Sequence, residues 1–293
     1  MVEMRETQLY LFDGTYELFR SYFAAPKRRA EDGREAGAVV GLLRGLTAFL
    51  TKTRVTYLAV AFDSVVESFR NELFAGYKSS EGIDRELLDQ FPLAEEAARA
   101  LGLVVWPMRE FEADDAIATA AARWKGAVEL ERIVICSPDK DFSQCIEGHR
   151  VVALDRRKDR IIDEEAVRER FGVGPESVPD WQGLVGDSAD GFPGVPGWGQ
   201  ASATALLQHY GHLESIPEGV GDWEVQVRGR ERLSTSLREH WEEALLYRRL
   251  ATLRSDVPLK ERLEDLRWEG PSEALKELCR RLRISDLSGR LGG

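Results

Sequence analysis

The chain has 293 residues, of which 43% are hydrophobic and 31% are charged, so it can bury a core as one large α/β domain with a smaller appendage. Its formal net charge of −11 excludes a generally basic coat protein for nucleic acid. No run approaches the roughly 18 apolar residues of a membrane helix. We therefore expect a cytoplasmic protein without membrane contact. Local patches and bound cations can still attract DNA to an acidic chain.

Short apolar runs alternate with amphipathic stretches, which predicts an α/β fold with a mostly parallel sheet. The expected strands are Leu9–Phe12, Tyr57–Phe62, Leu103–Trp106, Ile133–Cys136 and Val151–Leu154. The expected helices are Ala36–Thr51, Glu86–Leu101 and Ala113–Trp124. The segment 64–91 interleaves aromatic and charged residues, and we expect a strandless excursion above the sheet there.

The second half of the chain has a different composition. After Asp163 the strand patterns stop and the chain becomes helical and rich in Gly and Pro, which places a subdomain boundary at about Asp163–Phe171. Residues Leu233–Leu253 are expected to form a closing helix that packs back on the sheet. The cysteines Cys136, Cys145 and Cys279 have no metal-type spacing, and we expect reduced, mostly buried thiols.

Acidic residues follow three of the expected strands. Asp13 follows the first, Asp63 the second and Asp139 the fourth, with Asp141 two residues later. Ligands of an open parallel sheet gather outside the carboxyl ends of its strands. One such Asp is commonly a helix cap or turn residue, whereas three at one edge indicate a site.

A further group of acids, Glu112, Asp114 and Asp115, opens an expected helix. One acid would satisfy the helix dipole, and such crowding is unfavourable unless cations neutralise it, so we favour metal ligation over capping. Asp187 and Asp190 repeat the three-residue spacing, which alone is more typical of a polar loop. Together the acids form an all-oxygen set that suits two Mg²⁺ or Mn²⁺ ions acting on a phosphodiester.

The stretch 194–199 is a Gly-rich hairpin that leads into an apolar helix, with Ala203 and Leu206-Leu207 expected to pack inward. An inter-helix turn is the simplest interpretation, but the full PGxGxxxA spacing favours backbone binding of phosphate. The residues assigned to this grip are Gly194, Gly197, Gly199, Gln200 and Ser202.

Cations for a DNA path are fewer. Arg70 and Lys78 each follow an aromatic residue in the segment 64–91. Lys27 and Arg28, with Arg29, form a second cluster, for which a solvated surface and DNA contact are equally good interpretations. Arg20, Lys27 and Arg28 are included in the expected DNA-binding set.

With these pieces assembled, the chain resembles the 5′-nuclease (flap endonuclease) family and the 5′→3′ exonuclease domain of bacterial DNA polymerase I. The resemblance covers about residues 8–260, in the family's order. The matching pieces are LFDGTYELFRSYFA, AVAFDSVVESFRNELFAGYK, FEADDAIATAA, SPDKDFSQ, GDSADGFPGVPGWGQASATALL and RRLATLRSDVPL. No polymerase sequence follows, which is typical of a stand-alone member.

The resemblance implies a PIN-like catalytic domain at 1–165 with a helical arch at about 64–91. It also implies a helix-hairpin-helix DNA-binding subdomain at 166–230, which often holds K⁺, and C-terminal helices at 231–293 that pack back on the catalytic domain. The family's metal-cluster acids fall on Asp13, Asp63, Glu112, Asp114, Asp115, Asp139, Asp141, Asp187 and Asp190.

The resemblance also implies catalytic roles. Arg70 and Lys78 match the cations at the base of the arch, and Lys78 would stabilise charge on the scissile phosphate. Asp13, Asp63 and Asp115 complete the expected catalytic set. The implied activity is a metal-dependent 5′-nuclease, as 5′→3′ exonuclease or flap endonuclease in replication or repair. The expected substrate is DNA with a 5′ end, flap or nick, and the expected state is a monomer.

Three positions depart from the family pattern. Glu81 replaces a basic residue, Ala201 replaces the hairpin Lys, and Gly191 replaces the Asn that usually precedes the PG region. Loss of cations weakens phosphate binding. Arg85 would restore part of the lost charge.

Three other functions compete with this interpretation. A haloacid-dehalogenase-type phosphatase needs a nucleophilic Asp two residues before Asp13, where this chain has Leu11. A PIN-domain ribonuclease lacks the hairpin. A DNA-junction binding protein with little nuclease activity is favoured by the lost cations and opposed by the intact carboxylates, which would otherwise be an unfavourable cluster of like charges.

Overall fold

A computed structural model describes residues 7–291 of the chain. These residues divide into two compact units. Unit 1 comprises the described residues up to Val66, Ser80–Ser137 and the chain from Ser255 onward, and unit 2 comprises Glu67–Ser79 and Pro138–Arg254. This division concerns compactness, and the functional assignment of 1–165, 166–230 and 231–293 stays a prediction.

Unit 1 contains four strands that pair in the order β3-β2-β1-β4 with every neighbour parallel. The strands are β1 Gln8–Asp13, β2 Tyr57–Asp63, β3 Val104–Met108 and β4 Arg132–Cys136. Each coincides with an expected strand to within two residues at either end. Buried Leu, Val and Ile side chains fill β1 and β4, as expected for strands covered on both faces.

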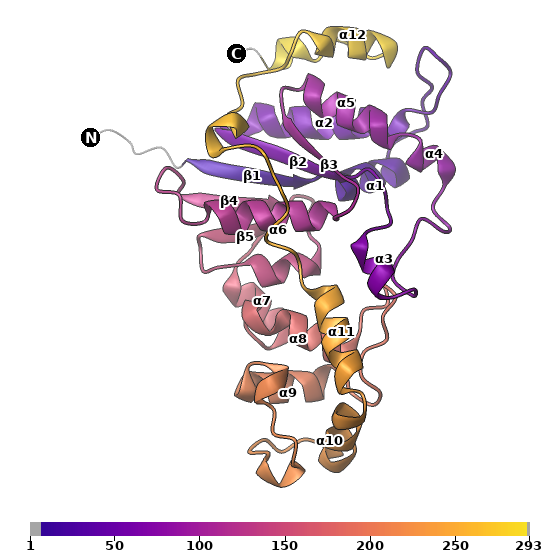
Figure 1. Cartoon of the computed structure of the whole chain (residues 1–293). Coiled ribbons are helices and arrows are strands. Elements are labelled where there is room, and N and C mark those ends of the chain that lie inside the picture. The colour runs from indigo at the N-terminus through magenta and orange to yellow at the C-terminus, as the bar shows by residue number, and fades with distance from the viewer. Residues whose placement is uncertain (1–6, 292–293) are drawn as a thin grey trace, which may run out of the picture. The chain divides into compact units, whose positions relative to one another are not determined.

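The helices of unit 1 cover both faces of these strands. They are α1 Gly14–Ala24, α2 Gly37–Lys52, α4 Arg85–Leu88, α5 Phe91–Ala100, α6 Ala113–Trp124 and α12 Ala274–Arg281, with 3₁₀ turns at Leu263–Leu266 and Ser288–Arg290. Figure 1 shows α2 and α5 on one face and α6 on the other, while α12 packs on α5. Right-handed crossovers require this arrangement, because the strand order reverses between β3 and β4.

The expected helix Glu86–Leu101 is interrupted. It is divided into α4 and α5, and Pro92 lies in the first turn of α5. Proline is favoured there because a first-turn amide has no intrahelical partner, whereas inside one continuous helix the ring would clash with the preceding turn. The apolar period predicted the helical residues but not this interruption.

Unit 2 is mostly helical. Its elements are α3 Phe69–Leu73, β5 Val151–Asp155, β6 Arg160–Ile162, α7 Glu164–Phe171, α8 Val178–Val185, α9 Gln200–Tyr210, α10 Arg230–Glu239 and α11 Trp241–Ala251. Its 3₁₀ turns are η1 Lys140–Cys145, η2 Pro175–Ser177, η3 Leu213–Ser215 and η4 Val220–Asp222. β5 and β6 pair antiparallel, and β6 was not predicted because its three residues are too few for a pattern.

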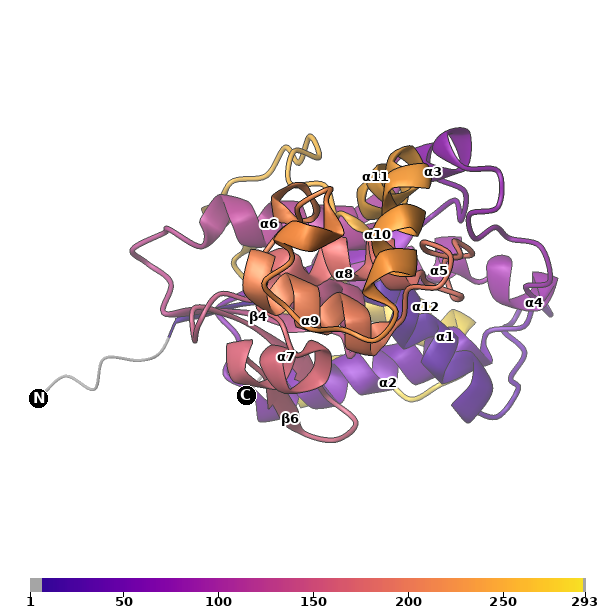
Figure 2. The ribbon, with the colours of Figure 1, turned by 90° about the horizontal axis from the view of Figure 1, so that it is seen from below.

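The expected closing helix Leu233–Leu253 is not continuous. It consists of α10 and α11, separated at His240, and α11 packs on α8 and α3 within unit 2. The expected packing of this segment on the sheet stays a prediction. Gly183 makes the α8–α11 contact close, since a Cβ at Gly183 would lie 2.9 Å from the Arg248 amide nitrogen. Figure 2 shows α8, α9 and α11 as neighbouring helices.

Two further expectations, on the strandless segment 64–91 and on the free cysteines, hold for the described residues. Between Ser64 and Phe91 there are short helices and no strand. The cysteines are free thiols, with Cys136 and Cys279 buried and Cys145 partly so. None of the helices within 7–291 is long and apolar enough to cross a membrane.

Candidate active site

Three carboxylates of unit 2 gather at one point. Asp141, Asp187 and Asp190 each place an oxygen within 4.8 Å of the other two. Asp141 lies in η1, next to Asp139, whose side chain caps that turn by accepting from the Asp141 amide at 3.0 Å. All three are buried, with at most 9% of each residue exposed. Among residues 7–291 this is the only such group of acids, His or Cys with this spacing.

A tight loop after α8 supplies two of these acids. The Asp187 amide donates to the Phe192 carbonyl at 2.8 Å, and the Phe192 amide donates back to the Asp187 carbonyl at 3.1 Å. This reciprocal pair closes the loop, and the Asp187 side chain accepts from the Ala189 amide at 3.0 Å. The GD-x-x-D segment therefore forms a closed loop that brings the carboxylates of Asp187 and Asp190 together. An irregular polar loop would not fix the two side chains in this way.

Two lysines and one amide contact this acid triad. Lys140 pairs with Asp187, and Lys78 pairs with Asp190 at 3.2 Å. Gln182 of α8 donates from Nε2 to Asp141 at 2.6 Å and to Asp187 at 3.3 Å. Its other polar atom, Oε1, is buried and accepts no hydrogen bond from any of residues 7–291.

The charge of the triad is not balanced by these contacts. Burial, with the neighbouring charges of Asp139, Asp190 and Asp187, raises the pKa of Asp141 from 3.8 to about 8. The pKa of Lys140 is also raised: burial lowers it, but the hydrogen bond to Asp187 and the nearby carboxylates outweigh that effect. The site therefore favours added positive charge.

These residues fit a divalent cation of the hard class. The donors are carboxylate oxygens, which Mg²⁺ and Mn²⁺ prefer, and the free Gln182 Oε1 adds a neutral oxygen beside them. The three oxygens within 4.8 Å of one another are close enough to share one ion. This group consists of carboxylates alone, without the Cys or His ligands that are typical of structural zinc sites.

Neutral donors contact Asp13, the first strand-end acid of unit 1. Asp13 caps α1 by accepting from the Tyr16 amide at 2.8 Å, and it also accepts from the Ser137 hydroxyl at 3.0 Å. The Cα of Asp13 is paired with that of Ala61 in β2, so Asp13 lies at the carboxyl edge of the sheet. This is where a strand-end acid is expected, and Asp13 also has the capping role that a single such Asp often has.

Asp63 and the Glu112 group lie at the same edge. Asp63 ends β2 and accepts from the Ala113 amide at 2.7 Å, which joins it to the start of α6. Asp115 accepts from the Glu112 amide at 3.0 Å and is fully buried. Capping, the alternative to metal ligation, is therefore present at Asp115, and metal ligation by these acids stays a prediction.

The two predicted arch-base cations differ in exposure. Arg70 is 1% exposed, and its guanidinium donates to the carbonyls of Leu250 at 2.8 Å and Thr252 at 3.0 Å, at the end of α11. Lys78 has a side chain 34% exposed beside Asp190. Lys78 thus lies at the acid triad, whereas Arg70 holds backbone within unit 2 and its predicted DNA contact stays a prediction.

The Gly-rich hairpin has the expected form. Gly194 and Gly197 have φ values of +74° and +81°, which glycine adopts without strain, and α9 begins at Gln200. Ser202 receives a hydrogen bond from the Gly199 amide at 3.2 Å and closes the first turn. Ala203, Leu206 and Leu207 are buried as expected.

A hollow of about 750 Å³ lies next to this hairpin within unit 2. Its lining includes Asp187 of the acid triad and Lys140, which pairs with Asp187. Gln200, at the start of α9, and Arg170 also line it. One predicted metal ligand, Asp187, and one residue of the predicted phosphate grip, Gln200, thus border the same depression.

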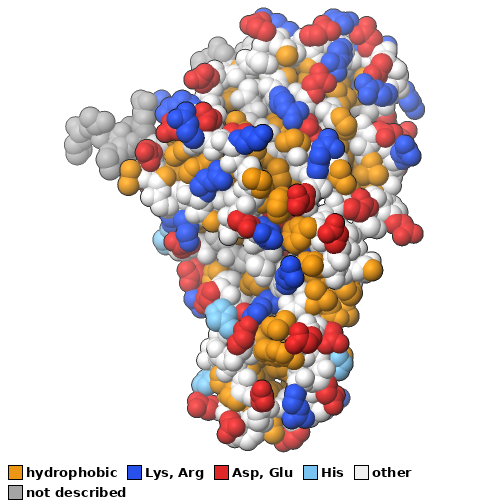
Figure 3. All heavy atoms as spheres, viewed as in Figure 1, with side chains coloured by type: hydrophobic (Ala, Val, Ile, Leu, Met, Phe, Trp, Pro, Cys, Tyr) orange, Lys and Arg blue, Asp and Glu red, His pale blue; other side chains and the backbone are white. Residues whose placement is uncertain are grey.

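The other predicted cations lie on the surface of unit 1. Arg20 pairs with Glu17 at 2.5 Å, Lys27 with Glu86 at 2.5 Å, and Arg28 donates to the Arg283 carbonyl at 2.9 Å. On the face shown in Figure 3, Lys and Arg are interspersed with Asp and Glu. Neither interpretation of the Lys27 cluster gains from this, and DNA contact by these residues stays a prediction.

Family models match the whole site-bearing region. Residues 8–172 match the 5′-3′ exonuclease N-terminal resolvase-like domain, and residues 173–274 match the 5′-3′ exonuclease C-terminal SAM fold. The chain belongs to the 5′-3′ exonuclease family. This membership confirms the resemblance found in the sequence.

Relatives of this 5′-3′ exonuclease family member include a stand-alone protein and polymerases. A 5′-3′ exonuclease of Aquifex aeolicus is 31% identical over 283 residues, covering 95% of this chain and 93% of that protein. DNA polymerase I of Bacillus caldotenax is 36% identical over 269 residues, or 90% of this chain. The chain spans only about 30% of the length of that polymerase.

Solved structures confirm the PIN-like fold. The T5 D15 protein co-crystallised with metal ions has a TM-score of 0.66 and 17% identity, covering 84% of this chain and 89% of that one. The catalytic core of Rad2 in complex with DNA substrate has a TM-score of 0.61 and 13% identity, covering 97% and 90%.

Two residues of the site were not assigned from the sequence. Lys140 lies inside the SPDKD piece, where only the acids were assigned. Its position between Asp139 and Asp141 was a signal that could have identified it. Gln182 precedes Asp187 by five residues in α8, and nothing in its local pattern distinguishes it from an ordinary helical glutamine.

Proposed function

We propose that this family member is a divalent-metal-dependent 5′-nuclease that hydrolyses DNA as a 5′→3′ exonuclease, a flap endonuclease or both. The observation that carries the metal dependence is the buried triad Asp141, Asp187 and Asp190, whose oxygens lie within 4.8 Å of one another. Three buried carboxylates at that distance repel one another, and a cation converts that repulsion into binding.

The metal ligands are proposed as two sets. In unit 2, Asp139, Asp141, Asp187 and Asp190 hold one ion, and in unit 1, Asp13, Asp63, Glu112, Asp114 and Asp115 hold another. Mg²⁺ or Mn²⁺ bound by such carboxylates lowers the pKa of water and stabilises charge on a departing oxygen. The titration of Asp141 limits binding in unit 2, because its carboxyl must lose a proton before it can ligate.

Lys78 is the proposed electrostatic catalyst. Its ammonium lies 3.2 Å from Asp190 and is partly exposed, so it can contact the triad and an arriving phosphate. Lysine suits this role because a compact charge stabilises developing negative charge on phosphoryl oxygens. Arg70 supports it from inside unit 2 by holding the carbonyls at the end of α11.

DNA would be gripped without reading its sequence. The hairpin around Gly194, Gly197 and Gly199 offers backbone amides to phosphate, with K⁺ as the ion that such a hairpin holds. The T5 flap endonuclease, of the same fold, has been crystallised with DNA and metal ions. We propose a monomer in the cytoplasm that meets 5′ ends, flaps or nicks during replication or repair, with or without a polymerase partner.

The test uses labelled 5′-flap, nicked and single-stranded DNA with Mg²⁺, Mn²⁺ or a chelator. We expect cleavage near the branch or the 5′ end that requires the metal and is lost in Asp115→Asn with Asp141→Asn. Glu165→Gln is the matched control, because it neutralises an exposed acid on the first turn of α7, and it should cleave as the unaltered chain does. Branched DNA bound but never cut would instead favour the junction-binding protein.

A further inference from the structure

The segment 67–79 belongs to the compact unit that carries the acid triad. The sequence placed this segment in an arch, where Lys78 would be a cation on a long excursion. Within unit 2, however, both the backbone and the side chain of Lys78 contact one residue of the triad. Its amide donates to the Asp190 carbonyl at 3.0 Å, and its ammonium lies 3.2 Å from the Asp190 carboxylate.

A second contact fixes the other side of the Lys78 backbone. Asn71 of α3 donates from Nδ2 to the Lys78 carbonyl at 2.9 Å. The same side chain accepts from the Ser68 amide at 2.8 Å, which closes the first turn of α3. Lys78 is therefore held from both sides, by α3 and by the loop that contains Asp190.

Gly191 makes the approach of the two segments possible. A Cβ at position 191 would lie 2.1 Å from the Gly76 carbonyl oxygen, and Gly191 has a φ of +87°. Both facts require glycine, because a side chain would clash with backbone and the left-handed conformation is strained for other residues. Gly191 is also a departure from the family pattern, in which Asn is usual near this position.

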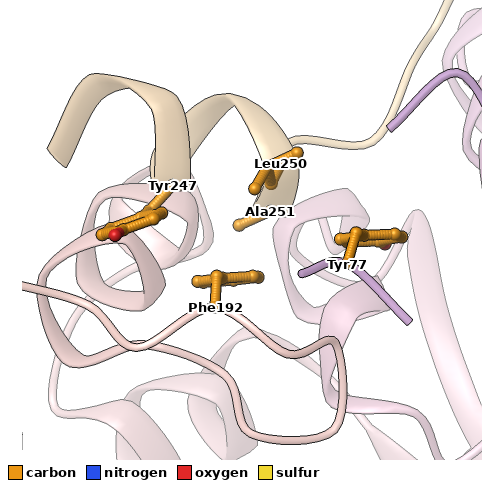
Figure 4. Close-up of a cluster of buried hydrophobic side chains, with 5 residues drawn as sticks. All are labelled: Tyr77, Phe192, Tyr247, Leu250 and Ala251. Carbon is orange, nitrogen blue, oxygen red and sulfur yellow. The ribbon is translucent and has the colours of Figure 1, made fainter. Parts of the chain in front are cut away.

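A buried hydrophobic cluster secures the same contact. It consists of Tyr77, Phe192, Tyr247, Leu250 and Ala251, with Leu73, Phe74 and Leu246 packed against it. Figure 4 shows Phe192 between Tyr77 and Tyr247, and the ring centroids of Phe192 and Tyr247 stack at 5.8 Å. The residues on either side of the Lys78–Asp190 contact, Tyr77 and Phe192, are thus anchored in one core that α11 completes.

We propose that Gly191 and Phe192 are positioning residues that hold the Lys78 ammonium at the acid triad before DNA binds. The close backbone approach at Gly191 sets the distance, and Phe192 fixes the direction by packing with Tyr77 and Tyr247. This inference rests on the proposed function, since it assigns how that site obtains its cation. It predicts that damage at Gly191 slows the chemical step through Lys78 and leaves DNA affinity unchanged.

The test is a double-mutant cycle on single-turnover cleavage of a 5′-flap DNA in Mg²⁺. Gly191→Ala should slow cleavage about 30-fold, because a displacement of about 1 Å from productive geometry costs up to about 100-fold. Lys78→Ala should slow it about 100-fold. In the Lys78→Ala background, Gly191→Ala should change the rate by less than about twofold, because the group it positions is already gone.

A matched control separates positioning from backbone strain. Gly229 has a φ of +75° with nothing within 4 Å of its Cβ position, so Gly229→Ala introduces strain without a clash and should cleave at the unaltered rate. Phe192→Leu keeps the backbone and shrinks the ring, and it should give a smaller slowing, about 5-fold, that also vanishes in the Lys78→Ala background. This variant keeps the proposal testable if Gly191→Ala does not fold.

The outcomes distinguish the two hypotheses. If the unaltered chain cleaves and Lys78→Ala is slow, but the Gly191 and Phe192 effects multiply with that of Lys78→Ala, the positioning inference is overturned and the proposed function stands. Weakened DNA binding in Ca²⁺ with an unchanged single-turnover rate would also overturn it. If the unaltered chain cleaves no DNA with any metal, the proposed function fails and the inference fails with it.

Discussion

The two acid sets of this protein differ in the described partners of their carboxylates. In unit 1, Asp13, Asp63 and Asp115 each accept hydrogen bonds from backbone amides that the fold places at the sheet edge. In unit 2, Asp187 and Asp190 contact the ammonium groups of Lys140 and Lys78, and Asp187 also accepts from the Ala189 amide. The lysine contacts and the raised pKa of Asp141 are signs of a high local density of negative charge.

This difference indicates that the acids of unit 1 have a structural role in addition to the metal binding proposed for them. An acid that caps a helix is justified by stability alone, even when it also binds a metal. The triad Asp141, Asp187 and Asp190 lowers stability as long as all three acids are charged and no metal ion is bound, since like charges repel at short range in a buried site. Its presence is therefore explained by binding rather than by folding.

The largest effect should come from the triad. Asp141→Asn removes one charged ligand and should slow metal-dependent cleavage at least about 100-fold, because a bound metal supplies several kcal/mol of transition-state stabilisation and about 1.4 kcal/mol is tenfold in rate. The same variant in chelator should unfold at the same or a higher temperature than the unaltered chain. A gel assay measures the cleavage rate, and calorimetry measures the melting temperature. A large loss of metal-free stability in Asp141→Asn would contradict the view that the triad does not serve folding.

The pH dependence of metal-free stability is a second test of the claim that the triad does not serve folding. The folded pKa of Asp141 is raised from 3.8 to about 8, so the folded state keeps a proton that the unfolded state releases. The resulting stability is complete below about pH 4 and is lost as the pH rises toward about 8. In chelator, the melting temperature of the unaltered chain should fall from about pH 5.5 to about pH 8.5 relative to that of Asp141→Asn. The expectation would be contradicted if the melting temperature of the unaltered chain minus that of Asp141→Asn stayed constant or increased with pH.

A smaller effect is expected from Lys140. Its ammonium competes with an added cation for the Asp187 carboxylate, so Lys140→Gln should strengthen Mn²⁺ binding about 3- to 10-fold. Lys158→Gln is a matched control, because Lys158 pairs at 3.8 Å with Asp155, outside the triad. Calorimetric titration measures both affinities. Weaker Mn²⁺ binding in Lys140→Gln would show that Lys140 supports the metal site instead of competing with it.

The smallest effect concerns the capping acids. Asp13→Ala removes the cap of α1 and should lower the free energy of unfolding by about 1 kcal/mol, as loss of such a cap commonly does. Asp13→Asn should retain most of that free energy, because Asn caps as well as Asp. Urea unfolding measures both. If the unaltered chain, Asp13→Ala and Asp13→Asn were equally stable, the cap at Asp13 would contribute nothing to folding and the comparison would be contradicted.

The sequence predicted the parallel strands well, because their apolar runs are short and bounded by polar residues. It also singled out Asp141, Asp187 and Asp190, which the fold brings together, because they lie in short motifs. The interruption between α4 and α5 was missed because the apolar period continues through Pro92. The burial of Arg70 was not predictable, because an Arg is rarely inside a protein unless distant carbonyls, here those of Leu250 and Thr252, satisfy it.

The site required information that no local pattern holds. Lys140 and Gln182 contact the triad only because η1 and α8 meet in unit 2, although they are far apart in the sequence. The contact of Lys78 with Asp190 depends on a glycine and a buried ring far from Lys78 in sequence. Motif spacing predicts the ligands, whereas the groups that contact the triad become visible only in the fold.

The central claim is that the acid triad binds a divalent cation. Its most direct test is a Mn²⁺ titration of the DNA-free protein, in which electron paramagnetic resonance measures the concentration of free Mn²⁺. The unaltered chain should bind Mn²⁺, and Asp187→Asn should lose one bound equivalent or bind it at least about 10-fold more weakly. Identical binding curves for the two proteins would show that the acids of unit 2 hold no cation, and the proposed role of the triad would be wrong.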